Sequence, residues 1–220
     1  MKNVILFILV LIFSSCASKK SIERKNISEY KLQNITESFD AKKLSYIGLK
    51  KYCVGGVPIE MSNKKDCKNC YSKNDIYIFW TDNNKSYVQK FDNCSEFNIV
   101  EILDFQPTEF LKNNSPELQT EKVGTYKVDK ETYSSVSHSC FKNYILNDGK
   151  MKYEKKFDIY DLTGENNNLN FKTNNSLLLI ELDNRLNEII SELEKENRFE
   201  RNKKTCYNNA YNPAVTFGYN

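Results

Sequence analysis

The sequence predicts an α+β fold, an antiparallel sheet of about five to seven strands packed against one long C-terminal helix. Two hairpin patterns predict the sheet: "DIYIFW" and "SYVQKF" flank "TDNNK", and two strand-like runs flank Asn147-Asp148-Gly149. A stripe of apolar residues spaced three and four apart near the C-terminus predicts the helix. The 14 Tyr and 13 Phe residues favour strands over much of the remaining chain.

The first twenty residues, "MKNVILFILVLIFSSCASKK", predict a cleaved signal rather than a structural element. Lys2 is followed by an apolar run from Val4 to Phe13, which is shorter than the ~20 residues of a membrane-spanning helix. Residues 1–15 are therefore excluded from the fold.

Small residues at Ser14 and Ser15 lead directly into Cys16. The run Phe13-Ser14-Ser15-Cys16 resembles the lipobox of bacterial lipoproteins, although that family prefers Leu where Phe13 stands. The resemblance implies cleavage before Cys16 and attachment of fatty acyl chains such as palmitate to it. Several acyl chains on one residue give a lasting membrane anchor.

After the expected anchor, residues 16–28 form a short polar tether, and residues 29–220 form a single globular domain. The Asn- and Lys-rich composition resembles that of the Bacteroidota. Exported surface lipoproteins of that group tend to carry acidic residues after the Cys, whereas Lys19 and Lys20 stand here. We therefore expect an exported, membrane-anchored lipoprotein of the cell envelope that faces the periplasm.

Strand candidates precede and include the two hairpins, and turn residues separate them. They lie at 44–49, 75–80, 86–91, 97–105, 124–129 and on both sides of Asn147-Asp148-Gly149. Pro107 and Pro116 bracket "TEFLKNNS", which predicts a loop or a short helical turn. The polar, Asn-rich segment 163–175 predicts a loop. Candidate core contacts of the second hairpin are Tyr153, Phe157, Ile159 and Leu162.

A helix is predicted over 176–200, with Asn175 or Ser176 capping its start. One apolar stripe runs along it and consists of Leu179, Leu182, Leu186, Ile189 and Leu193. The stripe is too short for a coiled coil, so we expect it to pack against the sheet.

With Cys16 assigned to the anchor, an even number of cysteines is left: Cys53, Cys67, Cys70, Cys94, Cys140 and Cys206. In an exported protein this predicts up to three disulfides, whose pairing the sequence leaves open. Cys67 and Cys70 form a CxxC motif, which suits a local disulfide, a redox pair or half of a zinc site. A second ligand pair for zinc is missing from the sequence, so we expect disulfides and no metal.

Candidates for catalysis are few. His138, the only histidine, lies two residues from Cys140, which we expect to be oxidised rather than nucleophilic. Carboxylate pairs suitable for a glycosidase are Asp104 with Glu109 and Asp158 with Asp161.

Interspersed charges, as in "ISELEKENRFERNKK", indicate a solvated face, and we expect no nucleic-acid partner. The leading hypothesis is a non-catalytic binding or structural protein of the envelope, for example one resembling an immunity protein or an inhibitor. We expect no cofactor, and we expect an envelope protein as partner. The alternatives are a carboxylate-based envelope hydrolase and a CxxC thiol redox protein.

Overall fold

A computed structural model describes residues 27–55, 59–60, 71–72, 74–92 and 95–202. Its centre is a six-stranded antiparallel sheet in the order β6-β5-β4-β1-β7-β8. The strands are β1 (Tyr46–Cys53), β4 (Asn74–Asp82), β5 (Lys85–Asp92), β6 (Glu96–Ile102), β7 (Cys140–Asn147) and β8 (Lys152–Asp158). A separate two-stranded sheet pairs β2 (Ile59–Glu60) with β3 (Tyr71–Ser72). The predicted α+β class and antiparallel sheet are confirmed.

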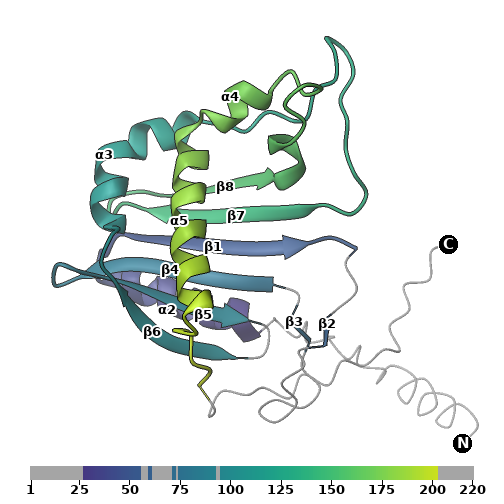
Figure 1. The fold of residues 1–220 in the computed structure, drawn as a ribbon. Helices are drawn as coiled ribbons and strands as arrows, with labels where there is room; N and C mark the ends of the chain where they lie inside the picture. Colours follow the sequence, from purple (N-terminus) through teal and green to yellow (C-terminus); the bar gives the residue numbers. More distant parts are fainter. Residues whose placement is uncertain (1–26, 56–58, 61–70, 73, 93–94, 203–220) are drawn as a thin grey trace, which may run out of the picture.

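Helices cover both faces of the sheet (Figure 1). On one face lie α3 (Pro107–Thr120) and α5 (Leu178–Lys195), and on the other lies α2 (Ile27–Ala41). A 3₁₀ turn η1 (Ile159–Leu162) and a short helix α4 (Phe171–Asn175) precede α5. The expectation of one long C-terminal helix therefore holds only in part. Helix α5 packs on the sheet as expected, but α3 lies beside it on the same face and α2 covers the other face.

Both predicted hairpins are confirmed, with turns of the expected chemistry. Asn83 and Asn84 have φ of 49° and 61°, the left-handed conformation that a two-residue hairpin turn requires and that Asn tolerates. Gly149 has φ of 87° in the second turn, where Lys43 O lies 3.0 Å from the position of a Cβ. These local signals fix the register of β4 with β5 and of β7 with β8.

Two apolar cores lie on opposite faces of the sheet. The larger one joins α3 and α5 to residues such as Ile47, Phe79 and Leu146. The smaller one joins Leu32 of α2 to a set that includes Tyr46, Ile78 and Trp80. Ile47 faces one core and Tyr46 the other because successive side chains of a strand point to opposite faces.

The apolar stripe predicted for the C-terminal helix is buried along its whole length in α5. The cap is different from the prediction. Residue Leu177 occupies the N-cap position without a side-chain bond, and the Glu121 carboxylate accepts hydrogen bonds of 2.8 Å from the backbone N–H groups of Leu178 and Leu179. A carboxylate just after α3 thus replaces Asn175 or Ser176 as the capping group.

The segment between Pro107 and Pro116 belongs to the 14-residue helix α3 and is not the predicted loop or short helical turn. Pro107 occupies the first turn, where its missing N–H costs nothing. Pro116 lies inside the helix on its exposed side. Burial of Leu111 and Leu118 against the sheet holds the helix together around this missing hydrogen bond.

The strand predicted at 124–129 is wrong, since only an isolated bridge joins Lys127 to Tyr133. Its backbone is bonded instead by side chains of the Asn-rich segment. Asn174 accepts from Gly124 N at 2.8 Å and donates to Gly124 O at 2.7 Å, and Asn168 accepts from Lys127 N at 3.1 Å. Asn168 and Asn174 are buried, so this predicted loop is an ordered element.

The second hairpin contributes fewer core residues than predicted. Phe157 is buried, and Tyr153 and Leu162 pack partly against the larger core. Ile159 is 37% exposed, because the chain leaves the sheet at Asp158 and turns into η1.

Candidate functional site

A groove runs along the seam between α5 and the segment that joins β6 to α3. It consists of three adjoining depressions of about 430, 550 and 380 Å³. The first shares Leu103 and Asp104 with the second and shares Phe105 and Phe110 with the third. We call this surface, formed by residues 101–114 and the facing residues 181–198, the α5 groove.

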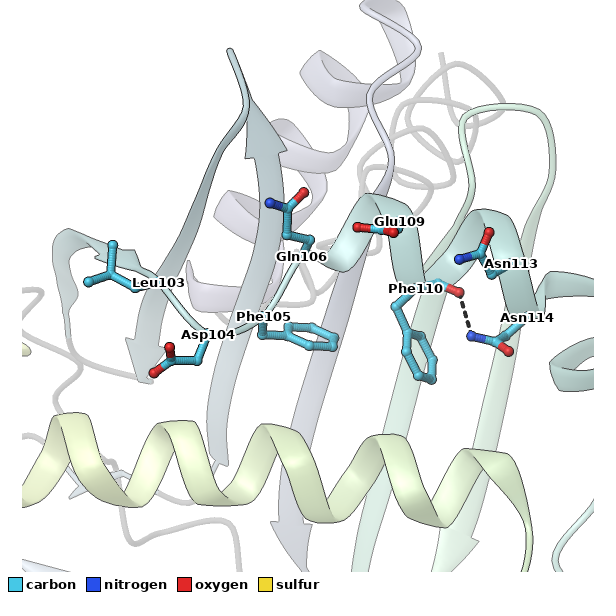
Figure 2. Close-up of a pocket in the computed structure, with 8 residues that line it drawn as sticks. All are labelled: Leu103, Asp104, Phe105, Gln106, Glu109, Phe110, Asn113 and Asn114. Atoms are coloured by element: carbon cyan, nitrogen blue, oxygen red, sulfur yellow. Dashed lines mark hydrogen bonds between the residues drawn. The ribbon is translucent and has the colours of Figure 1, made fainter.

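The middle of the α5 groove is apolar (Figure 2). The rings of Phe105 and Phe110 lie 5.8 Å apart, between α3 and α5. Leu103 is 84% exposed, more than any other large apolar side chain in the described part of the chain. Its position follows from the end of β6 at Ile102, after which the chain turns outward before Phe105 returns to the core.

Carboxylates surround this apolar centre. Seven acidic residues line the groove: Glu101, Asp104, Glu109, Glu181, Glu188, Glu192 and Glu196. The lining holds two arginines, and both have acidic partners within the protein. Arg185 bonds to Asp104 O at 2.9 Å and Glu188 at 3.3 Å, while Arg198 lies 3.6 Å from Glu196. The groove therefore combines an acidic rim with an apolar centre.

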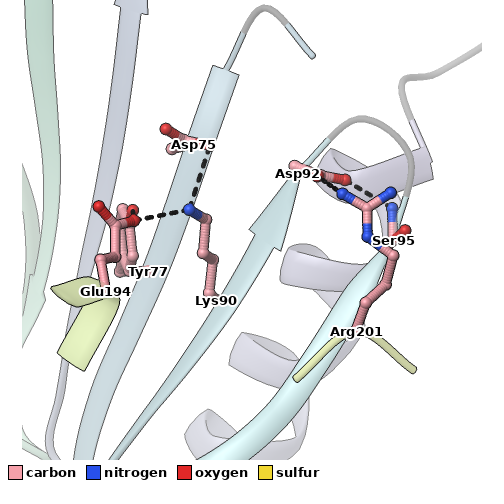
Figure 3. A network of polar contacts seen from close by, with 7 residues as sticks. All are labelled: Asp75, Tyr77, Lys90, Asp92, Ser95, Glu194 and Arg201. Atoms are coloured by element: carbon pink, nitrogen blue, oxygen red, sulfur yellow. Dashed lines mark hydrogen bonds and ion pairs between the residues drawn. The ribbon is translucent and has the colours of Figure 1, made fainter. Parts of the chain in front are cut away.

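A second cluster of charges fastens the end of α5 to the sheet (Figure 3). Lys90 Nζ lies 2.7 Å from Glu194 and 3.8 Å from Asp75, and Tyr77 donates to Glu194 at 2.7 Å. Next to it, Arg201 pairs with Asp92 at 3.2 Å.

Burial and pairing shift the pKa values of this cluster in different directions. Burial raises the pKa of Asp75, and the charge of Lys90 offsets this only in part. Burial also acts to raise the pKa of Glu194, but hydrogen bonds from Lys90 and Tyr77 outweigh it and lower that pKa. Burial lowers the pKa of Lys51 nearby.

Two carboxylates with pKa values shifted apart are a pattern of acid–base catalysis. However, neither Asp75 nor Glu194 lines any of the three depressions of the α5 groove. Glu194 is already engaged by Lys90 and Tyr77, and Phe199 packs on the Tyr77 ring at 5.9 Å. We therefore assign this cluster a structural role.

A buried polar group lies under the middle of α5. Asp183 accepts hydrogen bonds from Lys142 at 2.5 and 2.7 Å, from Tyr144 at 2.5 Å and from Asn187 at 3.0 Å. Burial and the Asp183 charge raise the pKa of Tyr144. Every partner is supplied by β7 or by α5 itself, so this group orients the helix on the sheet.

The predicted carboxylate pairs have different fates. Asp104 and Glu109 line the same depression, but their carboxylates point in different directions in Figure 2. Asp158 bonds to the Ser139 hydroxyl and to Tyr160 N, and Asp161 accepts from Tyr126 N at 2.8 Å. Asp158 and Asp161 thus hold loops in place.

Among the predicted cysteines, Cys53 and Cys140 form a disulfide between directly opposed residues of β1 and β7. This agrees with the expectation that Cys140 is oxidised, and it removes the nucleophile from the His138–Cys140 pair. His138 is exposed, and its Nδ1 lies 2.9 Å from the Ser137 hydroxyl. The remaining predicted cysteines lie outside the described residues, as does the lipidation candidate: Cys67, Cys70, Cys94, Cys206 and Cys16.

Within the described ranges, no group of three or more His, Cys, Asp or Glu side chains is arranged to hold a metal ion. In the same ranges, no helix has the length and apolar character needed to cross a membrane. Comparisons with protein-family models, curated proteins and solved structures returned no match.

The α5 groove was missed by the sequence reasoning, although α5 carries a signal for it. Glu181, Glu188 and Glu192 follow one another at helical spacings of seven and four along one side of α5. An exposed acidic row beside an apolar stripe indicates where a positively charged partner could meet the helix, but not which element forms the opposite wall. The partner wall, residues 101–114, depends on how β6 leads into α3, which no local pattern specifies.

Proposed function

We propose that this protein is a lipid-anchored protein of the bacterial envelope that acts by binding another protein through the α5 groove. The address is supported by the lipobox-like run ending at Cys16. The binding role is supported by the groove, an apolar centre with an acidic rim on an otherwise well-packed domain. Leu103 is exposed, Phe110 is partly exposed, and polar groups surround them, an arrangement that suits the binding of an apolar side chain.

The chemistry of the groove favours a basic segment that carries an apolar side chain. Lysine or arginine of the partner would meet carboxylates such as Glu188 and Glu192, and an aliphatic or aromatic side chain would cover Leu103. The single observation that carries this proposal is the exposure of Leu103 beside the five acidic residues of the two depressions that it lines.

Fluorescence anisotropy tests this proposal with a labelled peptide of about twelve residues that alternates Lys and Leu. We expect the peptide to bind the full mature chain and the affinity to fall as salt is added, because the attraction is partly electrostatic. A peptide with Glu in place of Lys should not bind. The variants Leu103→Ser and Glu188→Lys/Glu192→Lys should each weaken binding by about tenfold or more.

The matched control is the double variant Glu131→Lys/Glu165→Lys, which makes the same charge change at two exposed loop positions outside the groove. It should leave the affinity unchanged, and circular dichroism should show that all variants are folded. Equal binding of the Lys and Glu peptides, or unchanged affinity in the groove variants, would disprove the proposed binding surface.

A further inference from the structure

Two aromatic rings and two lysines form a strip on the face of the sheet that carries α2. Tyr52 of β1 and Phe141 of β7 are directly opposed, and their rings stack at 5.5 Å. Lys50 Nζ lies 5.5 Å from the Tyr52 ring centre, and Lys156 Nζ lies 4.7 Å from that of Phe141. All four side chains are at least partly exposed. We call this the cation–aromatic strip.

The strip occupies the part of this face that α2 leaves uncovered. Lys50 and Tyr52 alternate in phase with Tyr46, which belongs to the core under α2. That core extends over β4 and β5 through Ile76, Trp80 and Phe91 and not over β8. On this face Ile145 and Asn147 of β7 meet the core or α2, whereas Phe141 of β7 and Lys156 of β8, farther along the strands, are at least partly exposed.

The first described helix begins toward the same end of the sheet. Tyr46 at the start of β1 donates to Asp40 near the end of α2 at 2.9 Å. In Figure 1, α2 lies behind β4 and β5, and its beginning at Ile27 is on the side of the sheet at which β1 ends. Cys16 is eleven residues before Ile27, a distance of at most about 40 Å when fully extended.

We propose that the cation–aromatic strip rests on the headgroups of an anionic phospholipid bilayer, an inference that depends on the lipid anchor at Cys16 proposed above. Lysines are attracted to anionic lipids, and aromatic rings favour the membrane–water interface. The positive charge of this face is modest, because Glu154 lies on it and Lys152 is paired with Asp40. The strip would therefore orient the protein on the membrane, while the acyl chains supply most of the affinity. The α5 groove then lies on the opposite face, away from the membrane.

Lysine acetylation on vesicles tests this orientation. The full mature protein is purified from its native membrane, its intact mass establishes whether Cys16 carries lipid, and it is added to vesicles of phosphatidylglycerol with phosphatidylcholine or of phosphatidylcholine alone. On the anionic vesicles, acetylation of Lys50 and Lys156 should fall about fivefold or more, as expected for groups at the headgroups. Lys112 on α3 and Lys172 on α4 are exposed and should react equally on both.

The outcomes separate the strip from the anchor. If the protein carries lipid but Lys50 and Lys156 are acetylated on anionic vesicles as readily as Lys112, the proposed membrane contact of the strip is wrong. It is also wrong if a soluble anionic polysaccharide protects these lysines as well as the vesicles do. A mass without lipid would overturn the anchor. In that case, sedimentation of the unlipidated protein with anionic vesicles tests whether the strip contacts the membrane. The variant Lys50→Glu/Lys156→Glu should sediment less than the unchanged protein, and equal sedimentation would contradict the contact.

Discussion

Lys90 shows how one side chain holds the end of α5 in place. It lies between Glu194 of the helix and Asp75 of β4, and it is 15% exposed. The two carboxylates respond to this position differently, since Glu194 receives direct hydrogen bonds from Lys90 and Tyr77 while Asp75 stays 3.8 Å from the ammonium group. Their ionised forms should therefore have opposite effects on stability.

We expect Glu194→Gln to lower the free energy of unfolding near neutral pH. The pKa of Glu194 is lower in the folded protein than its usual 4.5, so its ionised form stabilises the fold, and this contribution is lost as pH falls through the folded pKa. The pKa of Asp75 is raised above 3.8, so its ionised form opposes folding once pH exceeds the folded pKa. Asp75→Asn should therefore raise the free energy of unfolding near neutral pH.

Urea unfolding near neutral pH and at a pH below 3.8 measures both variants. Each difference from the unchanged protein should shrink at the acidic pH, because protonation removes the charge of Asp75 there and progressively removes that of Glu194 as pH falls through its lowered pKa. A change of the same sign in both variants, or one independent of pH, would contradict the opposite roles assigned to them.

At the level of secondary-structure elements, the start of α5 depends on a residue that lies outside it. Glu121 follows α3 by one position and accepts from two free N–H groups of α5. A carboxylate there also interacts favourably with the helix dipole. This single side chain thus connects the end of α3 to the start of α5.

Glu121→Ala should lower the free energy of unfolding by about 1 kcal/mol, the usual effect of losing a helix cap, with some further loss from the dipole. Glu117→Ala is the control. Glu117 is exposed on α3, and its substitution removes the same charge as Glu121→Ala. Chemical denaturation of both variants gives the comparison. An equal loss from the two substitutions would show that Glu121 acts as an ordinary surface charge.

Elements with strong local patterns were predictable, and those held by distant residues were not. The apolar stripe of α5 and the turns at Asn83-Asn84 and Gly149 specify their structures within a few residues. By contrast, the run at 124–129 has the composition of a strand, but Asn168 and Asn174, about 40 to 50 residues away, bind its backbone. Glu121 was equally invisible as a cap because it lies 57 residues before Leu178.

At the scale of the whole molecule, the two faces of the sheet differ in character. The face with α3 and α5 carries the acidic groove, and the face with α2 carries the cation–aromatic strip. Neither surface could be predicted, because each combines residues from three elements. Of the candidate site residues, Cys53 and Cys140 are joined by a disulfide whose pairing the sequence left open, and Asp104 and Glu109 line the same depression of the groove.

Photo-crosslinking in the native cell tests the central claim, that the α5 groove binds a basic protein segment. A benzophenone amino acid replaces Leu103, or Leu169, an exposed apolar residue on the loop before α4, as control. We predict an adduct at position 103 alone, lost in Glu188→Lys/Glu192→Lys, whose crosslinked peptide is rich in Lys and Arg by mass spectrometry. An acidic peptide, the same adduct at position 169, or an adduct that survives the charge reversal would contradict the claim.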